Sequence, residues 1–220
     1  MVDVLNTETT LYLVRHGETD YNRRRIVQGR GIDSVLNETG RAQADAGARR
    51  LADVAFDVIY TSPLRRAAET AETIARRHAA VPLHGLADLE EMAWGIYEGK
   101  PFSPEIVTAL EAIRARWHNG EFDYQIPAGE SIHQVQQRGR RAISYMLTRH
   151  AGETVLVVTH GRYLRVLLAT LLEDYGLERM EEIPHANTGV NRLTYRNGRF
   201  EVALLNCTAH LDEAVFPGII

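Results

Sequence analysis

The chain has 220 residues, 45% of them hydrophobic, and a formal net charge of −4. This length suits one α/β domain and is enough to bury a sizeable core, so we expect a single domain over residues 1–220. The mildly acidic balance and the lack of a long basic run argue against a protein that acts mainly on nucleic acid or at a membrane surface.

The number of cysteines and the composition of the first residues indicate in which cellular compartment the protein works. Cys207 is the single cysteine, which excludes an internal disulfide and fits a reducing cytoplasm. The segment from Met1 to Thr10 is polar, and no apolar run in the chain is long enough to span a bilayer. We therefore expect a soluble cytoplasmic protein.

Alternating strands and helices are predicted for the first half of the chain. The strand Leu11–Val14 ends in Arg15-His16-Gly17, and a long polar loop continues to Leu36. Thr39 is predicted as the N-cap of the next helix, and Pro63 as a first-turn residue of the one after it. The elements expected after the loop are a helix over 39–53, a strand over 56–60, a helix over 63–78 and a strand over 81–84.

The second half opens with an acidic loop, Leu86 to Pro101, that contains several glycines. Ser103-Pro104 marks the start of a helix, and Gly129-Glu130-Ser131 precedes a longer one. The run Thr154–Thr159 is apolar throughout its middle, which is typical of a central parallel strand. The expected elements are helices over 103–117 and 131–149, the strand 154–159, a helix over 163–172, and strands over 190–195 and 200–205 joined by the hairpin dipeptide Asn197-Gly198.

This alternation predicts an α/β fold, a three-layer α/β/α sandwich whose sheet is mostly parallel with a late antiparallel strand. No internal repeat or low-complexity linker interrupts the pattern. The apolar segment Ala214 to Ile220 is expected either to cover the core or to form a contact in a homodimer.

Two predicted strands end alike, the first in Arg15-His16-Gly17 and the central one in Thr159-His160-Gly161. Parallel strands would bring both histidines to one edge of the sheet, where ligands of open α/β sheets bind. The end of the second strand adds Ser62 and, one helical turn further, Arg65 and Arg66. An anion there would meet guanidinium groups, imidazoles and helix N-termini. A phosphoryl group suits these donors, because its transfer depends mainly on positioning and charge stabilisation.

Four blocks share their residue types with one known family. They are Arg15-His16-Gly17-Glu18-Thr19 with Asn22 and Gln28-Gly29; Ser62-Pro63-Leu64-Arg65-Arg66-Ala67 with Thr70-Ala71; Leu89-Glu90-Glu91 with Gly95 and Glu98-Gly99; and Thr159-His160-Gly161. In this order they resemble the histidine phosphatase superfamily, in the branch with the phosphoglycerate mutases. The resemblance covers almost the whole chain, and it implies an enzyme for a small phosphorylated metabolite that needs no metal and no cofactor.

The resemblance implies a role for each matched residue. His16 would be the nucleophile that forms a phosphohistidine, and Glu91 would protonate the departing oxygen and later accept a proton from water. Arg15, Arg66 and His160 would bind the phosphoryl oxygens. The matched positions expected to contact substrate are Asn22, Gln28, Gly29 and Gly161.

Two adjacent pairs leave a choice, which family spacing decides in favour of Arg66 over Arg65 and Glu91 over Glu90. His185 is a candidate for substrate contact. The three arginines at 23–25 either face an anionic substrate tail or form a solvated loop. These arginines are Arg23, Arg24 and Arg25. The histidines expected to have no functional role are His78, His84, His118, His133 and His150.

Hydrolysis and mutase activity differ in whether water or a second hydroxyl receives the phosphoryl group. Met92-Ala93-Trp94 stands where the mutases carry arginine and tyrosine, so we expect hydrolysis. Departures from the phosphatase pattern at Tyr21, Tyr97 and Ile26 leave the physiological ester open. The alternative of another class is an inactive phospho-ligand sensor. A proton donor beside a nucleophile argues against that alternative, because binding alone needs neither.

Overall fold

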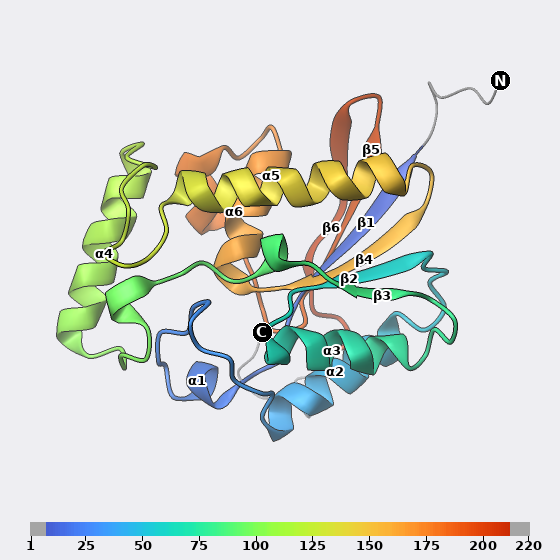
Figure 1. Cartoon of the computed structure of the whole chain (residues 1–220), viewed down its shortest axis with the longest axis horizontal. Helices are drawn as coiled ribbons and strands as arrows, with labels where there is room; N and C mark the ends of the chain where they lie inside the picture. The colour runs from blue at the N-terminus through green and yellow to red at the C-terminus, as the bar shows by residue number, and fades with distance from the viewer. Residues whose placement is uncertain (1–7, 212–220) are drawn as a thin grey trace.

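A six-stranded sheet forms the centre of the computed structural model, which describes residues 8–211 (Figure 1). In spatial order the strands are β3 (Leu83–Gly85), β2 (Val58–Thr61), β4 (Thr154–Thr159), β1 (Thr9–Arg15), β5 (Val190–Arg196) and β6 (Arg199–Cys207). The strands β1 to β4 are parallel, and β5 pairs antiparallel with both of its neighbours. The predicted mostly parallel sheet with a late antiparallel strand is confirmed.

Helices cover both faces of the sheet, which produces the three predicted layers (Figure 1). On one face lie α2 (Glu38–Arg50) and α3 (Arg65–Ala75), and on the other α5 (Ile132–Arg149) and α6 (Gly161–Leu171). The helix α4 (Pro104–His118) stands beyond the end of the sheet. Short elements complete the chain: α1 (Asp20–Arg23) and the 3₁₀ helices η2 (Ala87–Leu89), η3 (Gly95–Tyr97) and η4 (Leu177–Glu182).

The central strands contribute side chains to two separate apolar cores, because successive side chains of a strand face opposite sides of the sheet. Val155 and Val157 of β4 join the core beneath α5 and α6, whereas Leu156 and Val158 join the core beneath α2 and α3. All four are fully buried. Each such side chain contributes roughly 1.5–3 kcal/mol of transfer free energy. The double burial explains why this stretch lacks the polar alternation of a half-exposed strand.

Several boundaries follow the local sequence as predicted. The side chain of Ser103 caps α4, and Ser131 forms a capping box with Gln134 at the start of α5. Asn197 and Gly198 have φ angles of 51° and 81°, the left-handed values that a tight hairpin between β5 and β6 requires.

Other boundaries differ from the prediction. The N-cap of α2 is Asn37 rather than Thr39, because the Asn37 side chain accepts the backbone N–H of Gly40 at 2.8 Å. Pro63 lies before α3, whose N-cap is Leu64 in an extended conformation. The helix α6 begins at Gly161, two residues before the predicted Tyr163.

The remaining differences concern loops. The polar stretch after β1 contains the short helix α1, with Thr19 as its capping residue. His78 is buried rather than in an exposed turn, with its ring centroid 5.0 Å from that of Phe56. The segment from Ala214 to Ile220 lies outside the described residues. Within residues 8–211, no helix combines the length and apolar character needed to cross a membrane.

Candidate active site

The carboxyl ends of β1 and β4 lie side by side and in register. Arg15 is paired with Thr159, and the backbone N–H of His16 donates to the carbonyl of Thr159 at 2.9 Å. Each strand is followed directly by a histidine, so the rings of His16 and His160 meet with centroids 5.1 Å apart. Two residues 144 positions apart are thereby neighbours at the sheet edge.

The hydrogen bond of the His16 ring selects one tautomer. Its Nδ1 lies 2.6 Å from the carbonyl oxygen of Gly17. Because a carbonyl oxygen only accepts, Nδ1 carries the proton and Nε2 keeps a free lone pair. Burial holds the pKa of His16 well below its usual value, and the nearby charges of Arg66 and Arg15 lower it further. The ring is therefore neutral near pH 7.

His160 is held differently. It is fully buried, and its Nε2 lies 2.8 Å from the hydroxyl of Ser62 at the end of β2. Burial and the charge of Arg66 also hold the pKa of His160 well below its usual value. Its Nδ1 is buried with no hydrogen-bond partner among the described residues, so one polar atom of the ring is left for another group.

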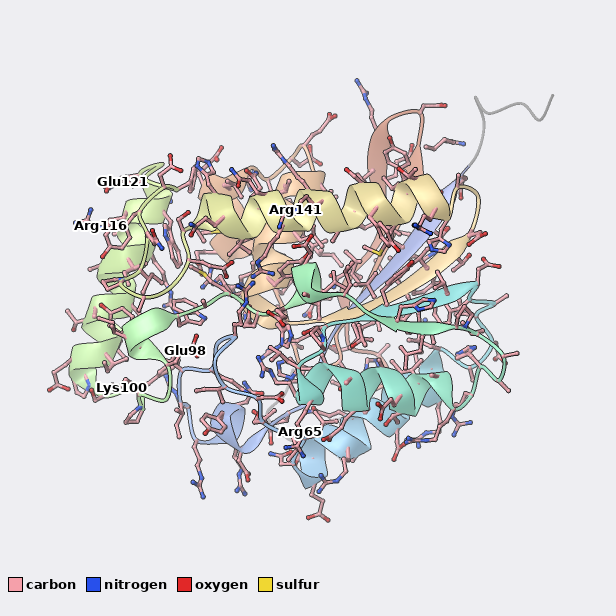
Figure 2. The ribbon with its side chains drawn as sticks, viewed as in Figure 1. Arg65, Glu98, Lys100, Arg116, Glu121 and Arg141 are labelled. Atoms are coloured by element: carbon pink, nitrogen blue, oxygen red, sulfur yellow. The ribbon has the colours of Figure 1, made fainter. Side chains whose placement is uncertain are left out.

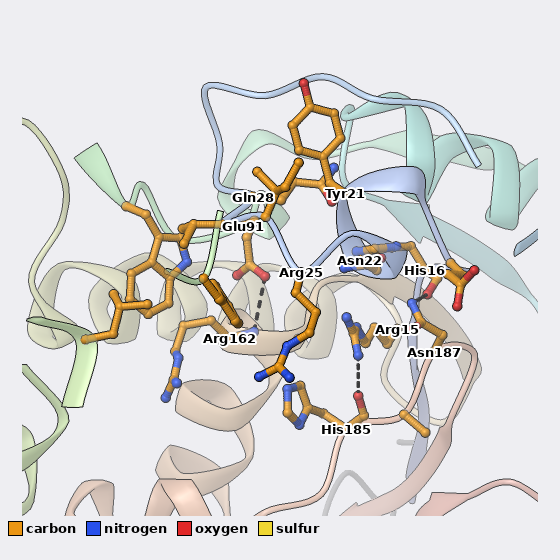
Figure 3. A pocket seen from close by; sticks show the side chains of 18 of the residues that line it. Arg15, His16, Tyr21, Asn22, Arg25, Gln28, Glu91, Arg162, His185 and Asn187 are labelled. Carbon is orange, nitrogen blue, oxygen red and sulfur yellow. Dashed lines mark hydrogen bonds between the residues drawn. The ribbon is translucent and has the colours of Figure 1, made fainter. Parts of the chain in front are cut away.

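A cavity of about 500 Å³ opens beside these strand ends (Figure 3). Six of the residues predicted for the site line it: Arg15, His16, Asn22, Gln28, Glu91 and Gly161. The other three, Gly29, Arg66 and His160, are not among its lining residues. A Cβ at Gly29 would lie 2.2 Å from a carboxylate oxygen of Glu98, so this glycine permits close packing of two loops.

The two adjacent arginines of α3 occupy opposite environments. Arg66 is fully buried and donates from Nη1 to the carbonyl of Ile32 at 2.7 Å. Burial lowers the pKa of Arg66 to about 10, which still leaves the group charged near neutral pH. Arg65 is exposed at the start of the helix (Figure 2). Only Arg66 therefore places its charge close to His16 and His160.

The two adjacent acids separate in the same way. Glu91 is 6% exposed, lines the cavity and accepts the backbone N–H groups of Arg162 at 3.1 Å and Tyr163 at 2.9 Å (Figure 3). Its carboxyl group thus lies at the N-terminus of α6, beside the cavity. Glu90 forms an ion pair with Arg30 outside the cavity.

Asn22 and Arg15 each keep donor capacity near the cavity. Asn22 uses its Oδ1 to accept the backbone N–H of Thr19 at 3.1 Å, which leaves the amide NH₂ available. Arg15 donates from Nη1 to the carbonyl of His185 at 2.7 Å, and its buried Nε has no partner among the described residues. A Cβ at Gly161 would lie 3.1 Å from that Nε and 2.6 Å from His185 Cδ2.

Further residues of the cavity were left open or missed by sequence reasoning. Arg25 and His185, which were left open, both line it, whereas Arg23 and Arg24 do not. Burial lowers the pKa of His185 to about 2, so its ring is neutral. Arg114 and Arg162 were missed, because neither stands in a recognisable motif. The apolar part of the lining comprises Ile26, Val27, Trp94, Phe102, Leu110 and Ala186.

The family assignment comes from residues 11–208, which match the histidine phosphatase superfamily, branch 1. The chain belongs to this superfamily, and it is a phosphatase. The metal-independent phosphoserine phosphatase of Arabidopsis thaliana is 32% identical over 217 residues, covering 98% of this chain and 88% of that protein. These findings confirm the resemblance seen in the sequence.

Solved histidine phosphatase structures share the fold. The YhfR protein of Bacillus stearothermophilus has a TM-score of 0.81 and 36% identity, covering 93% of this chain and all of that one. The phosphoserine phosphatase of Entamoeba histolytica, solved with 3-phosphoglyceric acid, has a TM-score of 0.80 and 27% identity, covering 93% of this chain and all of that one. Within residues 8–211 of this phosphatase, no group of three or more His, Cys, Asp or Glu side chains is arranged to bind a metal.

Proposed function

We propose that this phosphatase hydrolyses phosphate monoesters through a phosphohistidine formed on Nε2 of His16. The observation that supports this most strongly is the hydrogen bond from Nδ1 to the carbonyl of Gly17. It leaves Nε2 unprotonated on a neutral ring that lines a cavity with Arg15. An imidazole in this state is a competent nucleophile near neutral pH.

In the first half-reaction, the Nε2 lone pair attacks phosphorus and the bond from phosphorus to the ester oxygen breaks. Glu91 gives its proton to that oxygen, so the product leaves as an alcohol. In the second half-reaction, Glu91 takes a proton from water, the water oxygen attacks phosphorus and the P–N bond returns its electrons to Nε2. The enzyme ends in its starting state, so no other reactant is needed.

Charge stabilisation in both steps is assigned to the cations and dipoles around the histidines. Arg15 offers its unpartnered Nε to a phosphoryl oxygen, and His160 offers Nδ1. Arg66 supplies positive charge close to the two rings. The amide of Asn22 and the N-terminus of α6 at Gly161 add donors, whereas Gln28 and Gly29 shape the loop around them. Preorganised donors of this kind are commonly the largest catalytic contribution in such sites.

The preferred substrate is proposed to be a small phosphorylated metabolite with a second anionic group. Arg25 and Arg114 line the exposed side of the cavity, and neither forms an ion pair within residues 8–211. By contrast, Arg162 is paired with Glu181. Two unpaired guanidinium groups near an apolar wall suit a carboxylate on a short carbon chain. The 3-phosphoglyceric acid bound by the Entamoeba histolytica enzyme has this chemistry.

Hydrolysis is favoured over mutase activity because Met92-Ala93-Trp94 lacks the arginine and tyrosine of the mutases. A silent sensor is not favoured, because nucleophile and acid line one cavity. We also propose a single catalytic domain over residues 1–220, since the family match runs from 11 to 208. A cytoplasmic location is proposed from the single free cysteine, Cys207.

The test is phosphate release from a panel of monoesters in the presence of a chelator, with protein quenched in alkaline detergent examined for bound phosphate. Release without metal, together with an acid-labile and base-stable phosphoprotein, is expected. Release that requires an added metal, or a phosphoprotein that persists in His16→Ala, would contradict the proposal. Isomerisation of phosphoglycerate in place of release would identify a mutase.

The substrate preference has its own test. Arg114→Met is expected to raise the KM for 3-phosphoglycerate by about tenfold, the loss of one charge-assisted contact. The KM for p-nitrophenyl phosphate, which has no second anionic group, should stay unchanged. Equal effects on both esters would show that Arg114 does not select the substrate. Arg116→Met, an exposed position of the same helix outside the cavity, is the matched control.

A further inference from the structure

Arg138 of α5 is a buried arginine that does not line the catalytic cavity. It is 4% exposed, and its guanidinium forms four hydrogen bonds. Two go to the carboxylate of Glu130, from Nε at 3.0 Å and from Nη2 at 3.1 Å. The other two run from Nη1 to the backbone carbonyls of Asp88 at 3.1 Å and Glu90 at 2.5 Å. One side chain thus binds the backbone immediately before Glu91.

Glu130 continues this network on the other side of the acid. Its Oε2 accepts the backbone N–H of Ala93 at 2.9 Å, and its own backbone N–H donates to the carbonyl of Ala93 at 2.9 Å. Arg30 adds an ion pair to the same carboxylate at 3.3 Å. Residues on both sides of Glu91 are therefore attached to one ion pair, between the buried Arg138 and the partly buried Glu130.

The segment that carries Glu91 has little regular structure of its own. It lies between η2 and η3, and residues 90–94 belong to no helix or strand. At the C-terminal end of this segment, Gly95 packs tightly against another loop, since a Cβ at Gly95 would lie 2.0 Å from the carbonyl of Pro127. A backbone without helix or strand hydrogen bonds takes its position from side chains that bind it. Arg138 and Glu130 supply such bonds at Asp88, Glu90 and Ala93. The side chains of Thr159 and Glu98 bind the flanking positions Leu89 and Trp94.

Stability alone is a weak reason for such a pair. Desolvating two charges costs free energy that their attraction often does not recover, and apolar residues of similar volume are frequently as stable. The pair contributes positional precision. A guanidinium that binds one carboxylate through two hydrogen bonds, and two backbone carbonyls at the same time, can adopt only one arrangement.

We propose that Arg138, acting through Glu130, is a positioning residue that places the Glu91 carboxyl at the departing oxygen. This inference rests on the proposed role of Glu91 as proton donor and acceptor. Arg138 contacts no substrate in this scheme. A displacement of about 1 Å in a catalytic group can cost on the order of 10²-fold in rate.

The inference has a specific kinetic signature. An alcohol needs the Glu91 proton to leave, whereas p-nitrophenolate leaves without one at neutral pH. A misplaced Glu91 should therefore slow the phosphorylation of His16 by alkyl esters and leave phosphorylation by p-nitrophenyl phosphate nearly intact. Hydrolysis of the phosphohistidine, which needs Glu91 as base, should slow for every ester.

The experiment is rapid-quench kinetics on Arg138→Met with 3-phosphoglycerate and p-nitrophenyl phosphate. We expect an unchanged p-nitrophenol burst, an accumulating phosphoenzyme and turnover of 3-phosphoglycerate reduced by on the order of 10²-fold. Glu91→Gln should give the same pattern more strongly, and Arg138→Lys a weaker one. If Arg138→Met does not fold, Glu130→Gln should give the same pattern, because a glutamine has one acceptor oxygen and cannot bind both Nε and Nη2 of Arg138.

The matched control is Arg141→Met, one turn further along α5 (Figure 2). Arg141 is exposed and binds the side chain of Asp88, not the backbone of the segment. It should change neither step. Equal slowing of both esters and of the burst in Arg138→Met, or loss that tracks a lower melting temperature, would overturn the inference. A wild-type enzyme without any phosphoenzyme would instead overturn the proposed function.

Discussion

His16 and His160 follow adjacent strands, precede a glycine and are both neutral, yet the fold uses them differently. His16 lines the cavity and keeps Nε2 free, because its Nδ1 donates to the carbonyl of Gly17. His160 is fully buried and has its Nε2 occupied by Ser62. The same dipeptide thus leaves a free ring nitrogen beside the cavity at one strand end and a buried, hydrogen-bonded ring at the other.

The difference arises from the path of the chain beyond each histidine. After Gly17 the chain turns away as a loop, and a Cβ there would lie 2.4 Å from the carbonyl of Gly40 in α2. After His160 the helix α6 begins at once, with His160 as its N-cap. The loop leaves the ring of His16 beside open space, whereas the helix holds His160 against the sheet edge. The role of each histidine is set by its hydrogen-bond partner and not by the motif.

The largest predicted effect is the loss of turnover when the ring of His16 is removed. His16→Ala should lower kcat by on the order of 10⁴-fold or more, because the proposed nucleophile is lost. The circular dichroism spectrum should be unchanged, since the deleted ring lines a cavity. Turnover within tenfold of the wild type would mean that another atom attacks phosphorus.

A smaller loss is expected from the other ring. His160→Ala should lower kcat by roughly 10²–10³-fold, the cost of one preorganised donor to a transition-state oxygen. The phosphoenzyme should still form on His16, more slowly, which labelling with an alkaline quench would show. A loss as large as that of His16→Ala, with no phosphoenzyme, would make the two histidines equivalent.

The glycines beside the two histidines should differ in stability. Gly17→Ala drives Cβ into the backbone of Gly40 and should lower the free energy of unfolding by roughly 1–3 kcal/mol. Gly161→Ala meets the side chains of His185 and Arg15, which move more easily, so it should lower activity more than stability. The melting temperature and kcat of both variants test whether Gly17→Ala loses more stability and Gly161→Ala loses more activity. Equal losses of melting temperature would contradict it.

The smallest effect concerns titration, in which the two rings should behave alike. Both have a folded-state pKa well below the ordinary value of about 6.5, so below that pH the unfolded chain binds protons that the folded chain does not. Stability therefore falls as pH falls, by up to about 1.4 kcal/mol per pH unit for each ring. Denaturant unfolding of His16→Gln and His160→Gln should each show a flatter dependence below about pH 6.5. An unchanged slope, matching that of the exposed His118→Gln control, would show that the replaced ring is protonated in the fold.

Local chemistry was enough to predict much of the fold. The bounds of β4 follow from an unbroken apolar run, and the starts of α4 and α5 from Ser103 and Ser131, because burial on both faces and helix capping leave local marks in a sequence. The start of α2 was misplaced because Asn37 and Thr39 are both capable caps. Tertiary contacts favour Asn37, which donates to the distant Glu18 from its backbone N–H at 3.0 Å and from its side-chain amide at 2.7 Å.

For the site, the sequence by itself determined which residue types gather at the ends of β1, β2 and β4, since each stands beside a strand that its own pattern reveals. Only the tertiary structure decided that Arg66 turns inward and Arg65 outward, and that Arg114 reaches the cavity. It alone brought Arg138 to backbone carbonyls 48 and 50 residues away. Contacts across such separations depend on how helices and loops pack, and short-range periodicity carries no record of that packing.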